Sequence, residues 1–87
     1  MITYTSLVSQ MATAFILINS EIGEEKSVLD QLMSLPNVKE AHVVYGVYDL
    51  IAKIEAETMD LLKKIVTDNL RALENVRSTM TMICVEK

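Results

Sequence analysis

The sequence predicts an α+β domain of the ferredoxin-like type, with the element order βαββαβ and a four-stranded antiparallel sheet. Strand-like and helix-like segments alternate in that order, and 87 residues suffice for one domain only. The first half is also echoed in the second, since Leu32-x-x-Leu35-x-Asn37-Val38 recurs as Leu70-x-x-Leu73-x-Asn75-Val76. Two strand-helix-strand halves with right-handed crossovers interlock into such a sheet.

The first half begins with a predicted strand at Ala14–Ile18, an apolar run that suits a strand covered on both faces. A helix follows, because Glu24 and Glu25 are carboxylates placed near its N-terminus and Pro36 ends it. The side chains expected on its core face are Val28, Leu29, Leu32, Met33 and Leu35.

The first half ends with a strand predicted over residues 38–45, and a turn at Gly46 leads into the second half. Thr58 is the expected N-cap of a second helix, and residues 76–85 form the last strand. One side of the third strand is expected to carry Tyr48, Leu50, Ala52, Ile54 and Ala56. The apolar face of the second helix is expected to carry Leu62, Ile65, Val66, Leu70 and Leu73.

Composition excludes several classes of partner. Eight basic against twelve acidic residues give a net charge of −4, so the domain repels phosphate backbones and direct nucleic-acid binding is not expected. The single Cys84 cannot form an intramolecular disulfide, and no signal peptide or long apolar span is evident. We therefore expect a cytoplasmic protein without membrane contact, with residues 1–12 as an N-terminal extension or arm and 13–87 as the domain.

The second face of the sheet predicts a dimer. Helices cover only one face, yet both sides of the last strand are largely apolar or neutral: Met80, Met82 and Cys84 on one, and Thr79, Thr81, Ile83 and Val85 on the other. Burial of that second face, on which we expect Ile83, favours an obligate dimer in which two sheets pack face to face as a dimeric α/β barrel.

Polar side chains are expected to gather where the Gly46 turn, the start of the fourth strand and the start of the first helix share one end of the sheet. This end, called the rim below, comprises Ser20, Glu21, Tyr45, Tyr48, Asp49, Asn75, Ser78 and Thr79. A carboxylate suits an ammonium group, whereas hydroxyls and backbone N–H groups suit a carboxylate. The rim therefore predicts an amino-acid site.

Four motifs resemble one known family. Ala-Phe-Ile-Leu-Ile in the first strand, the helix exit Leu35-Pro36-Asn37-Val38, the hairpin Gly46-x-Tyr48-Asp49-Leu50 and the strand Ser78-Thr79-x-Thr81 look like the effector domain of the Lrp/AsnC (feast/famine) transcription regulators. The resemblance spans about residues 13–86. It implies a dimeric RAM domain that assembles further, commonly into a ring of four dimers, and binds an amino acid or related effector between dimers.

The segment before residue 13 is too short for the helix-turn-helix domain of such regulators. The chain therefore resembles a stand-alone effector domain that acts on transcription indirectly, by co-assembly with full-length regulators. Carried over by position, the ligand-binding residues are Gly46, Val47, Tyr48, Asp49, Leu50, Ser78, Thr79 and Thr81.

Each of these positions also has a structural explanation. Asp49 could receive the ligand ammonium or bond the N–H groups of its own turn. Gly46 serves the turn whether or not it contacts ligand. Tyr48 suits a core or an interface as well as a ligand wall, and the hydroxyl residues suit a half-exposed strand.

Two other functions remain open: a structural adaptor that sets oligomer size without binding a small molecule, and a small dimeric α/β-barrel enzyme. Catalysis would need a polar cluster, and the chain offers only His42 and Cys84, with no metal-ligand pairing. We expect His42 at a dimer surface, and we predict no enzyme activity, no cofactor and no metal site.

Overall fold

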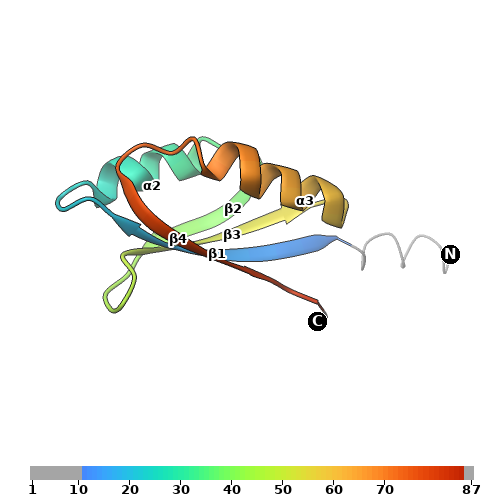
Figure 1. Cartoon of the computed structure of the whole chain (residues 1–87), viewed down its shortest axis with the longest axis horizontal. Helices are drawn as coiled ribbons and strands as arrows, with labels where there is room; N and C mark the ends of the chain where they lie inside the picture. Colours follow the sequence, from blue (N-terminus) through green and yellow to red (C-terminus); the bar gives the residue numbers. More distant parts are fainter. Residues whose placement is uncertain (1–10, 86–87) are drawn as a thin grey trace, which may run out of the picture.

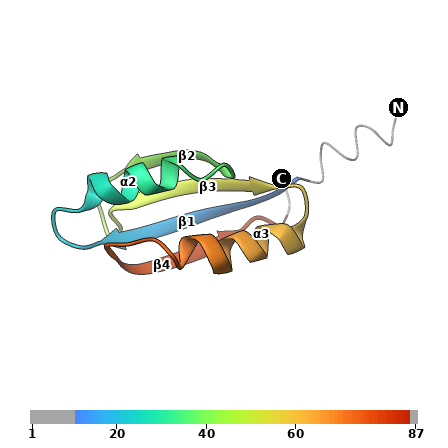
Figure 2. The same ribbon diagram turned by 90° about the horizontal axis from the view of Figure 1, so that it is seen from above.

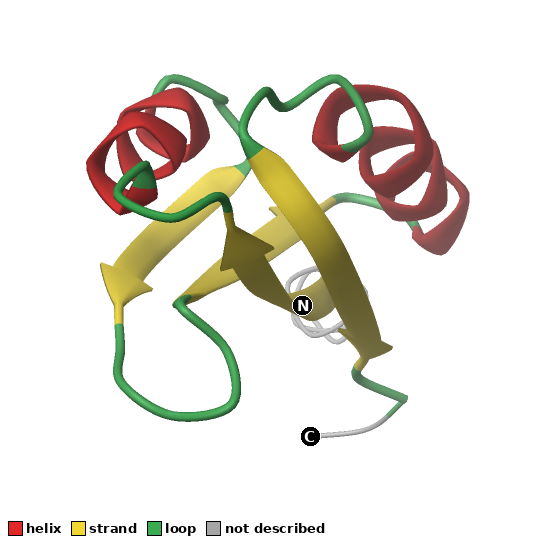
Figure 3. Cartoon of the chain, turned by 60° about the vertical axis from the view of Figure 1, so that its left-hand side comes forward, coloured by secondary structure: helices red, strands yellow, loops and turns green. Residues whose placement is uncertain are grey.

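The computed structural model describes residues 11–85 and contains one four-stranded antiparallel sheet with helices on one face (Figures 1 and 3). The strands are β1 (Ala12–Ser20), β2 (Val38–Val43), β3 (Leu50–Ala56) and β4 (Val76–Ile83). The helices are α2 (Glu25–Met33) and α3 (Met59–Ile65), and a π-helical segment, η1 (Val66–Leu70), continues α3. The predicted fold class and element order are confirmed. Of the predicted N-terminal extension, residues 1–12, the first ten lie outside the described residues, and Ala12 belongs to β1.

The sheet has the order β2-β3-β1-β4, so β1 and β3 are central and β2 and β4 form the edges (Figure 2). Alternate residues of β1 and β3 are buried, beginning at Ala12 and Leu50 respectively. The intervening residues are only half-buried, so each central strand is covered by helices on one side. The sequence predicts that β1 is covered on both faces. Within one chain only the helix side is covered, so the other face would have to be covered by a second molecule.

The core lies between this inner side of the sheet and the two helices. Central-strand side chains with no solvent exposure include Ile16, Ile18 and Ile54, and they meet Leu32 of α2 and Leu62 of α3 in one cluster. Each such side chain contributes roughly 1.5–3 kcal/mol when fully buried. The predicted inner residues of the third strand are confirmed from Leu50 onward.

Two side chains differ from the predicted core faces. Met33 is 55% exposed, because it is the last residue of α2 and lies beyond the stretch packed on the sheet. Tyr48 precedes β3 instead of belonging to it. By contrast, the predicted N-cap is confirmed, since the Thr58 hydroxyl oxygen accepts a hydrogen bond from the Leu61 N–H at 3.1 Å.

A bulge in β4 decides which side chains face the helices. Asn19 pairs with Ser78, but Ser20 pairs with Val76, so Arg77 is an extra residue in β4. Beyond the bulge, Thr79 and Thr81 pair with the buried Ile18 and Ile16 and therefore share their side of the sheet. Ile83 lies on that side too and packs against the core, so its predicted place on the open face is wrong.

Gln31 ties α2 to the loop that precedes β4. Its Nε2 donates to the Glu74 carbonyl at 3.0 Å, and the Glu74 N–H donates to Gln31 Oε1 at 2.9 Å. Asn75 follows in a left-handed conformation, at φ 67°, and its carbonyl accepts from the Glu21 N–H at 2.8 Å. The side-chain amide thus acts as a peptide group would and holds one of the loops that form the rim.

We expect Gln31→Ala to lower the free energy of unfolding by about 1–2 kcal/mol, because two hydrogen bonds at a partly exposed site are lost. Urea unfolding followed by circular dichroism measures this. Gln31→Glu is the matched comparison, since it keeps the acceptor for the Glu74 N–H but places an oxygen against the Glu74 carbonyl. Wild-type stability in both variants would show that water replaces this amide without cost.

Candidate functional site

Three loops form the rim, at the left end of Figure 1: the β1–α2 loop, the β2–β3 hairpin and the loop before β4. The first and third are joined by the hydrogen bond from Glu21 to Asn75. The hairpin is joined to β1 by the Asp49 N–H, which donates to the Ile18 carbonyl at 2.9 Å. Segments distant in sequence therefore meet at the predicted end of the sheet.

Asp49 has a structural partner that the sequence did not indicate. Its Oδ2 accepts from the backbone N–H of Ser20 at 3.0 Å and from the Ser20 hydroxyl at 3.4 Å. Ser20 is only 3% exposed, so its N–H depends on this carboxylate. The carboxylate thus holds the end of β1, instead of bonding its own turn. Its other oxygen receives no hydrogen bond from the residues that the structure describes.

The hairpin projects on the side of the sheet opposite the helices (Figures 1 and 3). Gly46 has φ +148°, a backbone conformation that favours glycine, which supports its predicted turn role. Tyr45 and Val47 are strongly exposed on either side of it. The Tyr48 hydroxyl lies 3.7 Å from Met80 Sδ, so this ring folds back toward β4.

The structure divides the predicted ligand-binding residues. Ser78 pairs with Asn19 of β1, its hydroxyl accepts from Asn19 Nδ2 at 3.3 Å, and it borders the cavity described below. Leu50 has no solvent exposure and supports the hairpin only from the core. The side chains of Thr79 and Thr81 lie on the helix side of the sheet, so a single chain does not bring them to the hairpin.

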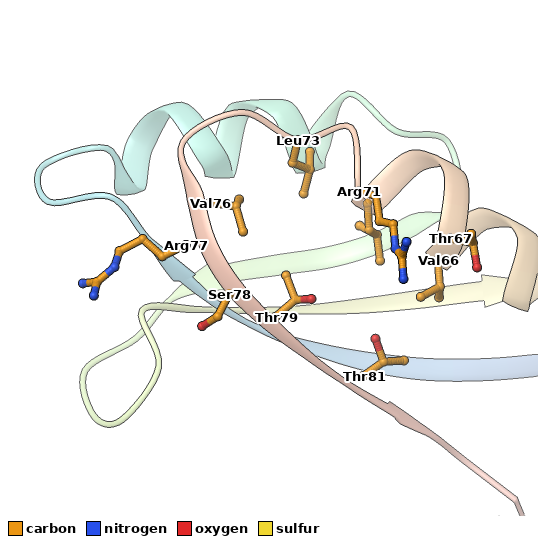
Figure 4. Close-up of a pocket in the computed structure, with 10 residues that line it drawn as sticks. Val66, Thr67, Arg71, Leu73, Val76, Arg77, Ser78, Thr79 and Thr81 are labelled. Atoms are coloured by element: carbon orange, nitrogen blue, oxygen red, sulfur yellow. The ribbon is translucent and has the colours of Figure 1, made fainter.

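Thr79 and Thr81 instead point into a cavity of about 330 Å³ between β4 and η1 (Figure 4). Arg71 and Thr67 border it from the helical side. Neither residue is among the site residues predicted from the sequence. The available signal was their spacing of four residues, which places both on one side of a helix.

The face of the sheet opposite the helices, called the open face below, carries an apolar centre with a polar border. Its central side chains come from three strands and are Phe15, Leu17, Ile51, Met80 and Met82. At the β2 edge His42 Nε2 lies 3.0 Å from Glu40 Oε1, and this hydrogen bond lowers the pKa of Glu40 from its ordinary value. His42 is thus placed at the surface where a dimer interface is predicted.

Within residues 11–85, no group of three or more His, Cys, Asp and Glu side chains could hold a metal ion. No helix in that part of the chain is both long and apolar enough to span a membrane.

The four-stranded sheet with both helices on one face defines the chain as an α+β domain of the ferredoxin-like type. A model of the Lrp/AsnC ligand binding domain matches residues 13–87, and the chain therefore belongs to the Lrp/AsnC family. The resemblance drawn from the sequence motifs is confirmed. The relatives that this chain matches over about half their length are transcriptional regulators, whereas homocitrate synthase of Sulfurisphaera tokodaii matches over only 13% of its length, which agrees with the prediction that the chain is not an enzyme.

Curated relatives in this family are transcriptional regulators. An HTH-type transcriptional regulator of Pyrococcus furiosus, itself uncharacterized, is 35% identical over 74 residues, which cover 82% of this chain and 49% of the relative. The chain thus spans about half the length of the curated relatives it matches.

Solved structures of similar size also match. The crystal structure of FFRP-DM1 is 43% identical with a TM-score of 0.80, and the match covers 85% of this chain and 99% of that one. A hypothetical protein of Pyrococcus horikoshii is 42% identical with a TM-score of 0.81, and the match covers 87% and 92% of the two chains.

Proposed function

We propose that this chain binds an amino acid or a related small effector at the rim and modulates transcription indirectly. The observation that carries the proposal is the state of Asp49: one carboxylate oxygen is anchored to Ser20, and the other is left for a ligand. A carboxylate fixed in this way is already oriented before the ligand arrives, which reduces the ordering cost of binding.

The rim offers a complement to each part of an amino acid. Asp49 would receive the ammonium group in a charge-assisted hydrogen bond. The Ser78 hydroxyl and the backbone N–H groups of the hairpin would receive the carboxylate, while Val47 and Tyr48 would contact the side chain. A regulator of Neisseria meningitidis with the same fold, 16% identical and with a TM-score of 0.76, was solved as a complex with L-Met, which supports this ligand class.

The proposal includes assembly of the chain with itself. The open face would pack against that of a second copy and form a dimeric α/β barrel, since its centre is apolar and Met80 and Met82 are each nearly half exposed. The exposed Tyr45 and Val47 at the hairpin tip would meet further dimers in a ring. Because relatives of this chain are HTH-type regulators, mixed assembly with a full-length regulator would connect the effector to DNA.

Thermal unfolding against a panel of the amino acids tests ligand binding. A ligand at about 100 times its Kd adds roughly 2.7 kcal/mol to the native state, so one or a few amino acids should raise the midpoint clearly. A flat response across the panel would contradict the proposal and favour the second candidate, a structural adaptor. The observation that favours an adaptor is the exposed apolar hairpin tip, Tyr45 and Val47, which could serve assembly alone.

Asp49→Asn separates the two duties of this side chain. The amide retains an oxygen for the Ser20 N–H, so we expect the fold and the dimer to persist. It removes the negative charge that would attract an ammonium group, so effector affinity should fall by about tenfold or more. Calorimetric titration with the effector found in the panel measures the loss. Unchanged affinity would mean that Asp49 serves the fold alone.

A further inference from the structure

The cavity between η1 and β4, called the β4 cleft below, shares Ser78 and Thr79 with the predicted rim but is lined by no residue of the β2–β3 hairpin. Its volume of about 330 Å³ falls at the lower end of the range of roughly 300–1,000 Å³ typical of small-molecule sites. Figure 4 shows Thr79 and Thr81 reaching into it from the strand, with Arg71 above them on the helical side. Arg77 also borders it, although its guanidinium group extends away from the cavity in the same view. The cleft thus suits a metabolite of a few carbon atoms.

The floor of the cleft is polar where the sheet beside it is apolar. Ile16 and Ile18, the partners of Thr81 and Thr79 in β1, have no solvent exposure because α3 packs over β1 and β3. The two threonines are exposed on that same side. The hydroxyl groups of Thr79 and Thr81 can therefore form hydrogen bonds with a ligand in the cleft. Its helical wall is the π-helical segment η1, a rare geometry that often marks functional sites.

The positive charge of Arg71 indicates that a ligand of the cleft carries a negative group. Arg71 forms no ion pair with any residue that the structure describes, and neither aspartate nor glutamate lines the cavity. A carboxylate can therefore bind the guanidinium group, whereas an ammonium group would find a cation and no counter-charge. The remaining wall is aliphatic: Val66, Leu70, Leu73 and Val76.

We propose that the β4 cleft is a second ligand site, which binds a short aliphatic carboxylate without an amino group, of the 2-oxo acid type. Arg71 binds the carboxylate, the Thr79 and Thr81 hydroxyls donate to the carboxylate or the 2-oxo oxygen, and the aliphatic wall contacts the carbon chain. This site includes no residue of the hairpin and needs no dimer, and its ligand carries an oxo group where an amino acid carries an ammonium group.

Calorimetric titration with 4-methyl-2-oxopentanoate tests the proposal. The Asp49→Asn chain is titrated beside the wild type, so that binding at the rim is separated from binding in the cleft. We expect saturable binding in both chains. L-leucine has the same carbon skeleton with an ammonium group, and in the Asp49→Asn chain it should bind about tenfold more weakly or worse. Absence of saturable binding by the 2-oxo acid would overturn the proposal, whatever the rim does.

Two variants that each remove one positive charge locate the site. Arg71→Met should weaken binding of the 2-oxo acid by about tenfold or more, because a charge-assisted contact is lost. Lys39→Met changes the net charge equally, but Lys39 lies on β2 at the opposite edge of the sheet and does not line the cleft, so affinity should be unchanged. Equal losses in both variants would show attraction by net charge only. That result would overturn the site.

A second variant and a second anion complete the test. Thr81→Val keeps the shape of the side chain and removes its hydroxyl, and it should weaken binding severalfold without unfolding the chain. Inorganic phosphate presents the anionic group without the carbon chain. If it displaced the 2-oxo acid with equal affinity, the aliphatic wall would contribute nothing, and the ligand class proposed here would be wrong.

Discussion

Replacement of Leu17 by lysine is expected to prevent formation of the proposed dimer and leave a monomer. Leu17 lies in the centre of the open face, where β1 pairs it with Ile51 on one side and Met80 on the other. An ammonium group there would be enclosed between two sheets without a partner, at an effective cost of several kcal/mol. Sedimentation equilibrium or light scattering at micromolar concentration measures the change in mass.

Leu61→Lys is the matched control. Leu61 is 41% exposed on α3, on the other side of the sheet from the open face, so the same substitution should leave the dimer intact. Circular dichroism of both variants would exclude unfolding as the cause of dissociation. A Leu17→Lys chain that remained dimeric would mean that the copies associate through another surface, and the face-to-face arrangement would have to be abandoned.

Asp49→Ala is expected to lower the free energy of unfolding by about 1–3 kcal/mol, because it leaves the buried N–H of Ser20 without its acceptor. For a domain of this size that corresponds to a fall in Tm of roughly 4–8 °C per kcal/mol. Thermal unfolding without added ligand measures it. The expected order of stability is wild type, then Asp49→Asn, then Asp49→Ala.

Asp68→Ala supplies the comparison for loss of a carboxylate at the surface. Asp68 pairs with Lys64 across one helical turn at 3.4 Å, and both side chains are largely exposed. Such pairs contribute little, typically below about 1 kcal/mol. If Asp49→Ala proved no more destabilising than Asp68→Ala, the bond to Ser20 would be dispensable, and selection of a carboxylate at position 49 would point to the ligand alone.

The element order and the core could be predicted from sequence because they depend on local patterns. The periodic apolar residues of both helices, Pro36 after the first and Thr58 before the second each act within a few residues of their position. The same holds for Leu50 to Ile54, whose alternation marks the inner side of β3. The Gly46 turn belongs to this group as well, because φ +148° is a local requirement.

The division of the candidate site could not be predicted, because it depends on the register between strands. A single extra residue at Arg77 places Thr79 and Thr81 on the helix side, whereas Ser78 pairs with Asn19. Likewise, the partner of Asp49 is Ser20, which is 29 residues away and carries no sequence signal of the pairing. The π-helical geometry of η1, which shapes the β4 cleft, was not foreseen either.

By itself, then, the sequence determined the fold class, the family and the end of the sheet where the loops meet, since periodicity, turn chemistry and motif spacing are all written along the chain. Only the tertiary structure decided which side of the sheet each β4 side chain faces and what Asp49 holds. The physical reason is that strand alternation has a period of two residues, so that one bulged residue reverses every assignment beyond it.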